Sequence, residues 1–258
     1  MTARAIWKGV LQLEGEEVPV KLYSALENVR VSFRLLSRAD NAPVRQVMID
    51  PENDKVVEHE DTGKAYRSGD RLVELSDADL EELEPEPSRE ISLLSFVPPE
   101  TIDHRWYERP YWLGPDGDED SWSALGTALA NTGLTGIARW VMRKKQYVGA
   151  LRLREGRPLL ITMRHAGEVI PLEDVDFRAD SEIDQKQLKM AQQLIAMLEG
   201  EFEHESLVDE YRESVLDLIE RKQAGKTIRR RRPAERPELA DLSAALERSL
   251  KREKADAP

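Results

Sequence analysis

Apolar and polar residues alternate along the first part of the chain, as they do in strands that have one buried face. The alternation is partial at residues 18–23 and 29–34, and we expect residues 4–36 to form strands. Shorter apolar runs bounded by Gly, Pro and Asp predict more strands, and the loop at 154–158 predicts a hairpin. These strands are expected at residues 91–97, 110–113, 137–142, 147–153 and 159–163. Up to about residue 178 the pattern therefore predicts a mostly antiparallel β protein with a few helices.

Two helices are expected inside this β region. Ser76 and Asp79 have the spacing of a capping box, and Pro85 closes the short helix that they begin. Ser121 is expected to cap a second helix, which carries Trp122, Leu125 and Leu129 on one face and ends at Gly133.

After residue 178 the apolar period changes to 3.6 residues, which is typical of amphipathic helices. One helix is expected around Ile183, Leu188, Ala191, Ile195 and Leu198. Ser206 is expected to cap a second, which Gly225 ends. Residues 226–237 contain four consecutive arginines and two prolines and indicate a flexible linker. Leu239, Leu242, Leu246 and Leu250 would then line one face of a short final helix.

The charge of the chain is unevenly distributed. The net charge is −12, which taken alone argues against a nucleic-acid binder. Residues 49–120 hold 22 acidic against 7 basic side chains, whereas residues 137–167 hold 8 basic against one acidic. Residues 221–236 are again 8 basic against one acidic. A protein of this kind attracts phosphate with one surface while its remaining surface repels it.

Several function classes find no support in the sequence. The chain has no cysteine, which excludes disulfides, thiolate zinc sites and cysteine nucleophiles. No apolar run approaches the ~20 residues of a membrane span. The four histidines lack metal-ligand spacing, and no phosphate-binding glycine loop or nucleophile elbow occurs. We therefore expect no enzyme activity, no metal and no cofactor, in a protein of the cytoplasm.

Several short motifs follow one another over roughly residues 3–225. The first two are Arg4-Ala-Ile-Trp-Lys-Gly9 and Val18-Pro-Val-Lys-Leu-Tyr-Ser24. The next are Leu75-Ser-Asp-Ala-Asp-Leu-Glu-Glu-Leu-Glu-Pro85, Arg109-Pro-Tyr-Trp-Leu-Gly-Pro-Asp116 and Ile137-Ala-Arg-Trp-Val-Met-Arg143, and the last is Asp209-Glu-Tyr-Arg-Glu-Ser-Val-Leu-Asp-Leu-Ile-Glu-Arg-Lys222. In this order they resemble the opening strands, the small central helix, the barrel strands and the helical arm of the bacterial Ku family.

The resemblance implies a mixed β and α fold with an antiparallel β-barrel core, an arch-like insertion and a C-terminal helical arm. On this basis residues 1–178 would form the barrel with an arch at roughly 40–75, and residues 179–225 the dimerisation arm. Residues 226–258 would be a basic linker and a short helix. The family forms homodimeric rings that encircle double-stranded DNA ends without reading sequence, and recruits a multifunctional ATP-dependent ligase for non-homologous end joining. A nucleoid-associated location follows from the same resemblance.

Candidate DNA contacts are basic side chains, because binding without sequence specificity needs phosphate contacts. Arg152 and Arg154 are two residues apart and so share a strand face, with Leu151 and Leu153 on the other. An ordinary solvated strand face is the alternative reading of this pattern. The leucines of the final helix are the candidate ligase contacts. The charge pattern selects Arg139, Arg143, Lys144, Lys145, Arg152, Arg154 and Arg164, and the resemblance adds Arg4, Lys8, Lys64 and Arg67.

Two other functions remain open on the sequence alone. One is an acidic adaptor that binds proteins and carries incidental basic patches. The other is an RNA-binding β-barrel. Binding to blunt duplex, to single strands and to structured RNA separates the three.

Overall fold

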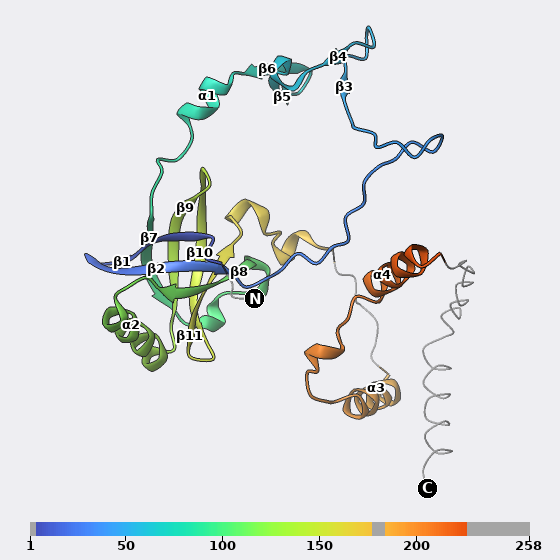
Figure 1. Ribbon diagram of the computed structural model, residues 1–258. Helices are drawn as coiled ribbons and strands as arrows, with labels where there is room; N and C mark the ends of the chain where they lie inside the picture. The colour runs from blue at the N-terminus through green and yellow to red at the C-terminus, as the bar shows by residue number, and fades with distance from the viewer. Residues whose placement is uncertain (1–3, 177–183, 226–258) are drawn as a thin grey trace. The chain divides into compact units, whose positions relative to one another are not determined.

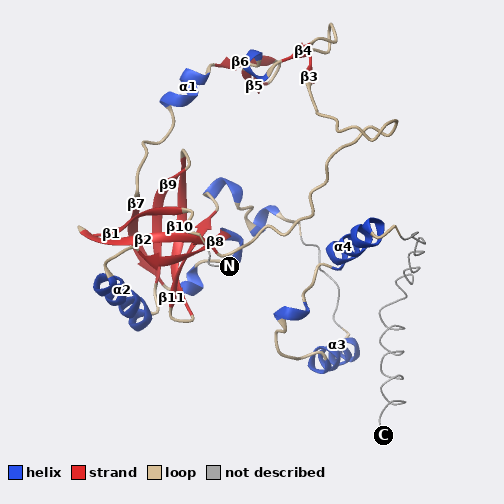
Figure 2. Cartoon of the chain, in the orientation of Figure 1, coloured by secondary structure: helices blue, strands red, loops and turns tan. Residues whose placement is uncertain are grey.

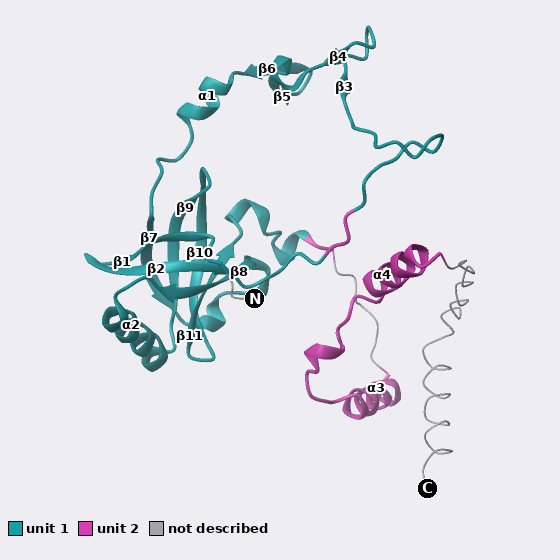
Figure 3. Ribbon diagram, viewed as in Figure 1, with its two compact units in different colours: residues 1–29, 33–174 teal, residues 30–32, 175–258 magenta. Residues whose placement is uncertain are grey.

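The computed structural model describes residues 4–176 and 184–225 (Figure 1). The chain divides into two compact units, one of residues 1–29 and 33–174 and the other of residues 30–32 and 175–258 (Figure 3). The first unit holds a β-barrel and a long excursion from it. The second holds two helices.

Seven strands close into a barrel in the order β1-β2-β8-β11-β10-β9-β7 (Figure 2). All neighbours pair antiparallel except β1 and β7, which close the barrel as a parallel pair. The prediction of an antiparallel β-barrel core is thus confirmed, with this one parallel seam. The strands are β1 Trp7–Leu13, β2 Glu16–Ser24, β7 Glu90–Val97, β8 Tyr107–Pro115, β9 Thr135–Met142, β10 Lys145–Arg154 and β11 Arg157–Met163.

The barrel interior is filled by alternate side chains of its strands, as period 2 requires. Leu11, Leu22, Ile91, Leu151 and Leu160 are completely buried there. Helix α2, Glu119–Thr132, adds Leu125 and Leu129 to the same core and lies against the barrel (Figure 1). The apolar positions that predicted the strands are therefore the ones that fill the barrel.

The chain leaves the barrel after β2 and returns at β7, and residues 25–89 form the excursion (Figure 2). The predicted arch at 40–75 falls within it. The predicted strand at 29–34 is wrong, because this stretch has no partner strand and the Phe33 side chain is exposed. The excursion contains the hairpins β3 Met48–Ile49 with β4 Val56–Val57 and β5 Lys64–Ser68 with β6 Arg71–Leu75, followed by helix α1 Asp77–Glu82.

Of the two helix caps predicted in the first unit, the one at α1 is confirmed and the one at α2 is wrong. Ser76 and Asp79 form the expected capping box at α1. At α2 the cap is Asp118 and not Ser121, because the Asp118 carboxylate accepts the backbone N–H of Ser121 at 3.0 Å. A carboxylate also suits the positive end of the helix dipole.

The second unit contains α3, Gln185–Met197, and α4, Glu210–Gln223. Asp209 caps α4, so the prediction of Ser206 at this place is wrong; the Ser206 hydroxyl instead donates to the Glu203 carbonyl oxygen. Ile183 and the leucines at 239, 242, 246 and 250 lie outside the described residues. No described helix is long and apolar enough to cross a membrane.

Single 3-10 turns of the two units lie at His59–Asp61, Pro99–Thr101, His104–Trp106, Ala166–Glu168, Leu172–Asp174 and His204–Ser206.

Candidate nucleic-acid interface

Strand register places both ends of the excursion at one end of the barrel. Leu22, near the end of β2, lies opposite Trp7 at the start of β1. Strand β7 runs parallel to β1 and begins with Glu90 opposite Val10. Both limbs therefore emerge where β1 begins, with only β1 between them. We call this the arch end of the barrel.

The hairpin between β9 and β10 points to the same end. Trp140 on β9 lies opposite Ile91, the second residue of β7, so residues 142–145 reach past the start of β7. This tip carries Arg143, Lys144 and Lys145, which we call the basic hairpin. The register alone thus brings three predicted DNA contacts to the end of the barrel from which both limbs of the excursion emerge.

The turn of the basic hairpin has an unusual backbone. Met142 pairs with Lys145, and both residues between them have positive φ, 51° at Arg143 and 62° at Lys144. Two-residue turns of this kind favour glycine at the second position, because a Cβ is strained there. Two other barrel turns of this geometry have it, as Glu14-Gly15 and Glu155-Gly156. The basic hairpin holds a lysine where its counterparts hold glycine, and strained positions of this kind cluster at functional sites.

Other predicted DNA contacts lie along the outer surface of β9 and β10. Arg139 is exposed and lies opposite Val148. Arg152 points outward over the Tyr107 ring, 5.7 Å from its centroid, while Leu151 is buried, as the alternation predicted. Arg154 lies at the opposite end of the barrel, nine residues and roughly 30 Å of strand from Lys145. The basic block is thus split between the two ends.

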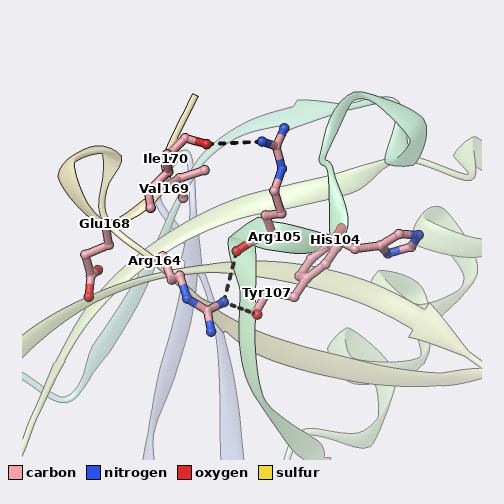
Figure 4. Close-up of a pocket in the computed structure, with 7 residues that line it drawn as sticks. All are labelled: His104, Arg105, Tyr107, Arg164, Glu168, Val169 and Ile170. Carbon is pink, nitrogen blue, oxygen red and sulfur yellow. Dashed lines mark hydrogen bonds between the residues drawn. The ribbon is translucent and has the colours of Figure 1, made fainter. Parts of the chain in front are cut away.

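Arg164 lies beside a hollow of about 590 Å³ at the arch end, also lined by His104, Arg105 and Tyr107 (Figure 4). Its Nη1 donates to the carbonyl oxygens of Arg105 at 2.9 Å and Tyr107 at 2.6 Å, which ties β11 to the start of β8. Arg105 donates from Nη1 to the Ile170 carbonyl oxygen, and Asp103 accepts from its Nε. The hollow is thus bordered by two guanidinium groups that are fixed by hydrogen bonds.

The three predicted lysines other than Lys145 each contact a carboxylate. Lys8 lies 3.0 Å from Asp116, Lys64 lies 2.8 Å from Asp77, and Lys144 lies 2.9 Å from Glu84. The hydrogen bond with Lys64 holds the pKa of Asp77 below its ordinary value, and that with Glu84 raises the pKa of Lys144. Among the described residues, the cations that make no ion pair include Arg67, Arg139, Arg143 and Lys145. An anion that bound these four side chains would displace no carboxylate.

The excursion supplies fewer of the predicted DNA contacts than the barrel, namely Lys64 and Arg67. Lys64 and Arg67 differ by an odd number of positions on β5, so they lie on opposite faces of its hairpin. Arg4 is exposed before β1.

Sequence reasoning missed two arginines at the arch end, Arg105 and Arg109. Arg109 donates to the Ser24 hydroxyl at the exit of β2 and lies over the Tyr111 ring. Both belong to the acidic block at 49–120, so counting charge along the chain concealed them. The available signal was an arginine between two tyrosines at every second position, Tyr107, Arg109 and Tyr111.

Comparison with known proteins agrees with this architecture. The model of the Ku70/Ku80 beta-barrel domain matches residues 14–190. The chain therefore belongs to the Ku family.

Similar relatives are bacterial proteins named non-homologous end joining protein Ku. One, Ku 1 of Geotalea uraniireducens (strain Rf4), is 30% identical, with 97% of this chain and 98% of the relative covered. The protein of Anaeromyxobacter sp. (strain K) is 35% identical, with 96% and 85% covered. That of Mycobacterium tuberculosis (strain CDC 1551 / Oshkosh) is 33% identical, with 96% and 95% covered.

Proposed function

We propose that this protein is a non-catalytic homodimer that encircles the ends of double-stranded DNA and brings an ATP-dependent ligase to them for non-homologous end joining. The observation that carries the proposal is the common position of the basic hairpin and both limbs of the excursion at the arch end. A loop that starts and ends beside a basic surface suits a duplex lying between the two. The names of the relatives agree with this role.

Binding of this kind reads the backbone and not the bases. The proposed contacts are Arg and Lys side chains on strands and a turn, and phosphate contacts fix position without carrying sequence information. Most carboxylates of the acidic block would lie outside the DNA path and repel a second duplex. A chain of net charge −12 would then hold DNA by local charge.

Encirclement is tested by topology, since a closed ring loads only at an end. Linear and relaxed circular DNA of one sequence compete with a labelled short duplex. We expect the linear molecules to compete and the circles to compete poorly. Equal competition at equal base-pair concentration would mean that the protein binds DNA from the side. Single-stranded and structured RNA competitors test the RNA-binding alternative in the same assay.

Homodimerisation is supported by the apolar surface of the second unit. Leu198, Phe202, Leu207 and Tyr211 are all more than 70% exposed in the single chain. Exposed apolar patches of this kind mark protein interfaces, and obligate dimers bury them. Light scattering should give a dimer at micromolar concentration for the wild type and a monomer for Phe202→Asp/Tyr211→Asp. Leu83→Asp, which changes an equally exposed leucine of the excursion, should stay dimeric. A monomeric wild type would contradict the ring.

Ligase recruitment is proposed for the segment after Gly225, through Leu239, Leu242, Leu246 and Leu250. A leucine stripe suits a groove on a partner. A chain truncated after Gly225 should bind linear duplex but no longer stimulate the ligase. Full stimulation by the truncated chain would place the ligase contact elsewhere.

A further inference from the structure

The return limb of the excursion runs past the basic hairpin. After α1, the chain from Glu84 to Arg89 lines a hollow of about 430 Å³, and the hairpin residues Arg143 and Lys144 line its other side. Glu81 of α1 and Trp7 of β1 complete this hollow. An acidic stretch of the excursion and a basic turn of the barrel thus face each other.

One ion pair joins the two sides. The Lys144 Nζ lies 2.9 Å from Glu84 Oε2 and 3.2 Å from Oε1, across 60 positions of sequence. Glu84 is partly covered, with 35% of its side-chain surface exposed, whereas 69% of Lys144 is exposed. The ammonium group is therefore still open to an anion from solvent while Glu84 holds it.

Lys144 lies in a turn with a constrained backbone. Positive φ at both Arg143 and Lys144 gives the turn a narrow backbone geometry, and Lys144 stands where the other two turns have glycine. Arg143 and Lys145 make no ion pair with any described residue. In the free protein, the hairpin thus offers two of its three charges and keeps the third on Glu84.

We propose that Glu84 competes with DNA phosphate for Lys144. The ion pair between the return limb of the excursion and the basic hairpin must therefore break before all three cations of the hairpin bind DNA. This rests on the proposed function, in which the hairpin contacts the duplex backbone. When a phosphate binds Arg143 and Lys145, Lys144 leaves Glu84 and binds the phosphate as well. The return limb of the excursion then loses its ion pair with the barrel. Glu84 thereby lowers the affinity for DNA and links the arch to the occupancy of the hairpin.

The test is a double-mutant cycle on the full-length protein, read as the affinity for a short linear duplex. Glu84→Gln should bind about two- to fivefold more tightly than the wild type, the range expected for an exposed ion pair. Glu82→Gln removes the same charge from the end of α1, but Glu82 pairs with no described cation and should change affinity less. Lys144→Gln should weaken binding more strongly in the Glu84→Gln background than in the wild type.

The outcomes separate this inference from the function on which it rests. If the wild type binds no duplex, both the proposed function and the competition by Glu84 are wrong. If the wild type binds duplex but Glu84→Gln equals Glu82→Gln, Glu84 is no competitor. If Glu84→Gln tightens binding equally when Lys144 is already Gln, the effect is one of net charge, and the competition is again wrong. Only a gain that requires Lys144 supports the proposal.

Discussion

Gly149 on β10 and Trp140 on β9 are packed so closely inside the barrel that a Cβ added at Gly149 would lie 2.7 Å from the Trp140 ring. The same Cβ would lie 2.6 Å from the Ile161 carbonyl oxygen. The indole is almost completely buried and stacks on Tyr147, with ring centroids 5.5 Å apart. Since neither the backbone nor the indole has room to move, glycine is the residue that fits here.

Gly149→Ala should therefore destabilise the barrel, by about 1–3 kcal/mol for an overpacked core. The matched control is Gly126→Ala in α2, where an added Cβ meets no atom within 4 Å. That change should be neutral or stabilising by up to about 1 kcal/mol, because alanine favours a helix. Urea midpoints measure both. Equal midpoints for the two variants would contradict the packing described here.

Replacing Arg143-Lys144 by Asn-Gly should stabilise the fold and weaken DNA binding. The new residues suit positive φ, so the melting temperature should rise by about 2–4 °C for each kcal/mol gained. Two cations are lost from the proposed DNA surface at the same time. Glu155→Asn makes a similar improvement at the opposite end of the barrel and should leave binding to duplex intact. Unchanged DNA binding by the Asn-Gly variant would show that the turn does not contact DNA.

The salt dependence of DNA binding should distinguish the two ends of the basic block. Arg143→Gln/Lys145→Gln removes two unpaired cations at the arch end and should make the slope of log K against log[salt] shallower by roughly two units. Arg157 lies opposite Arg154 at the far end, where β10 pairs with β11. Arg154→Gln/Arg157→Gln removes the same charge there, and we expect a smaller change. Titrations at several salt concentrations measure the slopes. A larger change at the far end would move the DNA path there.

Asp116 should contribute to stability at neutral pH and lose that contribution in acid. Hydrogen bonds from Lys21 first, and then Lys8, hold the pKa of Asp116 below its ordinary value of 3.8. The unfolded carboxyl therefore takes up a proton before the folded one, and stability falls as pH decreases through about 4 and below. Thermal unfolding from pH 7 to pH 3 should show the difference between wild type and Asp116→Asn shrinking as pH falls. A difference between the two proteins that stays constant from pH 7 to pH 3 would exclude this linkage.

Much of the barrel could be predicted from local pattern, because strands with one buried face leave a period of two in the sequence. The strand around Leu22 lies where alternation placed it, and those around Ile91, Leu151 and Leu160 lie where the shorter apolar runs placed them; all four residues are buried in the core. The same pattern failed at 29–34, since alternation cannot reveal whether a partner strand exists. Capping motifs predicted the Ser76 cap correctly but selected Ser121 and Ser206 where Asp118 and Asp209 are the caps. Serine and aspartate are nearly equal at this position, and backbone geometry chooses between them.

The sequence by itself determined the strand pattern, the basic block and the family resemblance, because each depends on residues that are close together in the chain. Tertiary structure decided that β1 and β7 close the barrel and that both limbs of the excursion and the basic hairpin lie at one end of it. It also decided which cations are already held by carboxylates, such as Lys144 by Glu84 across 60 positions of sequence. Strand register and ion pairing join residues far apart in the chain, and only the folded barrel sets those distances.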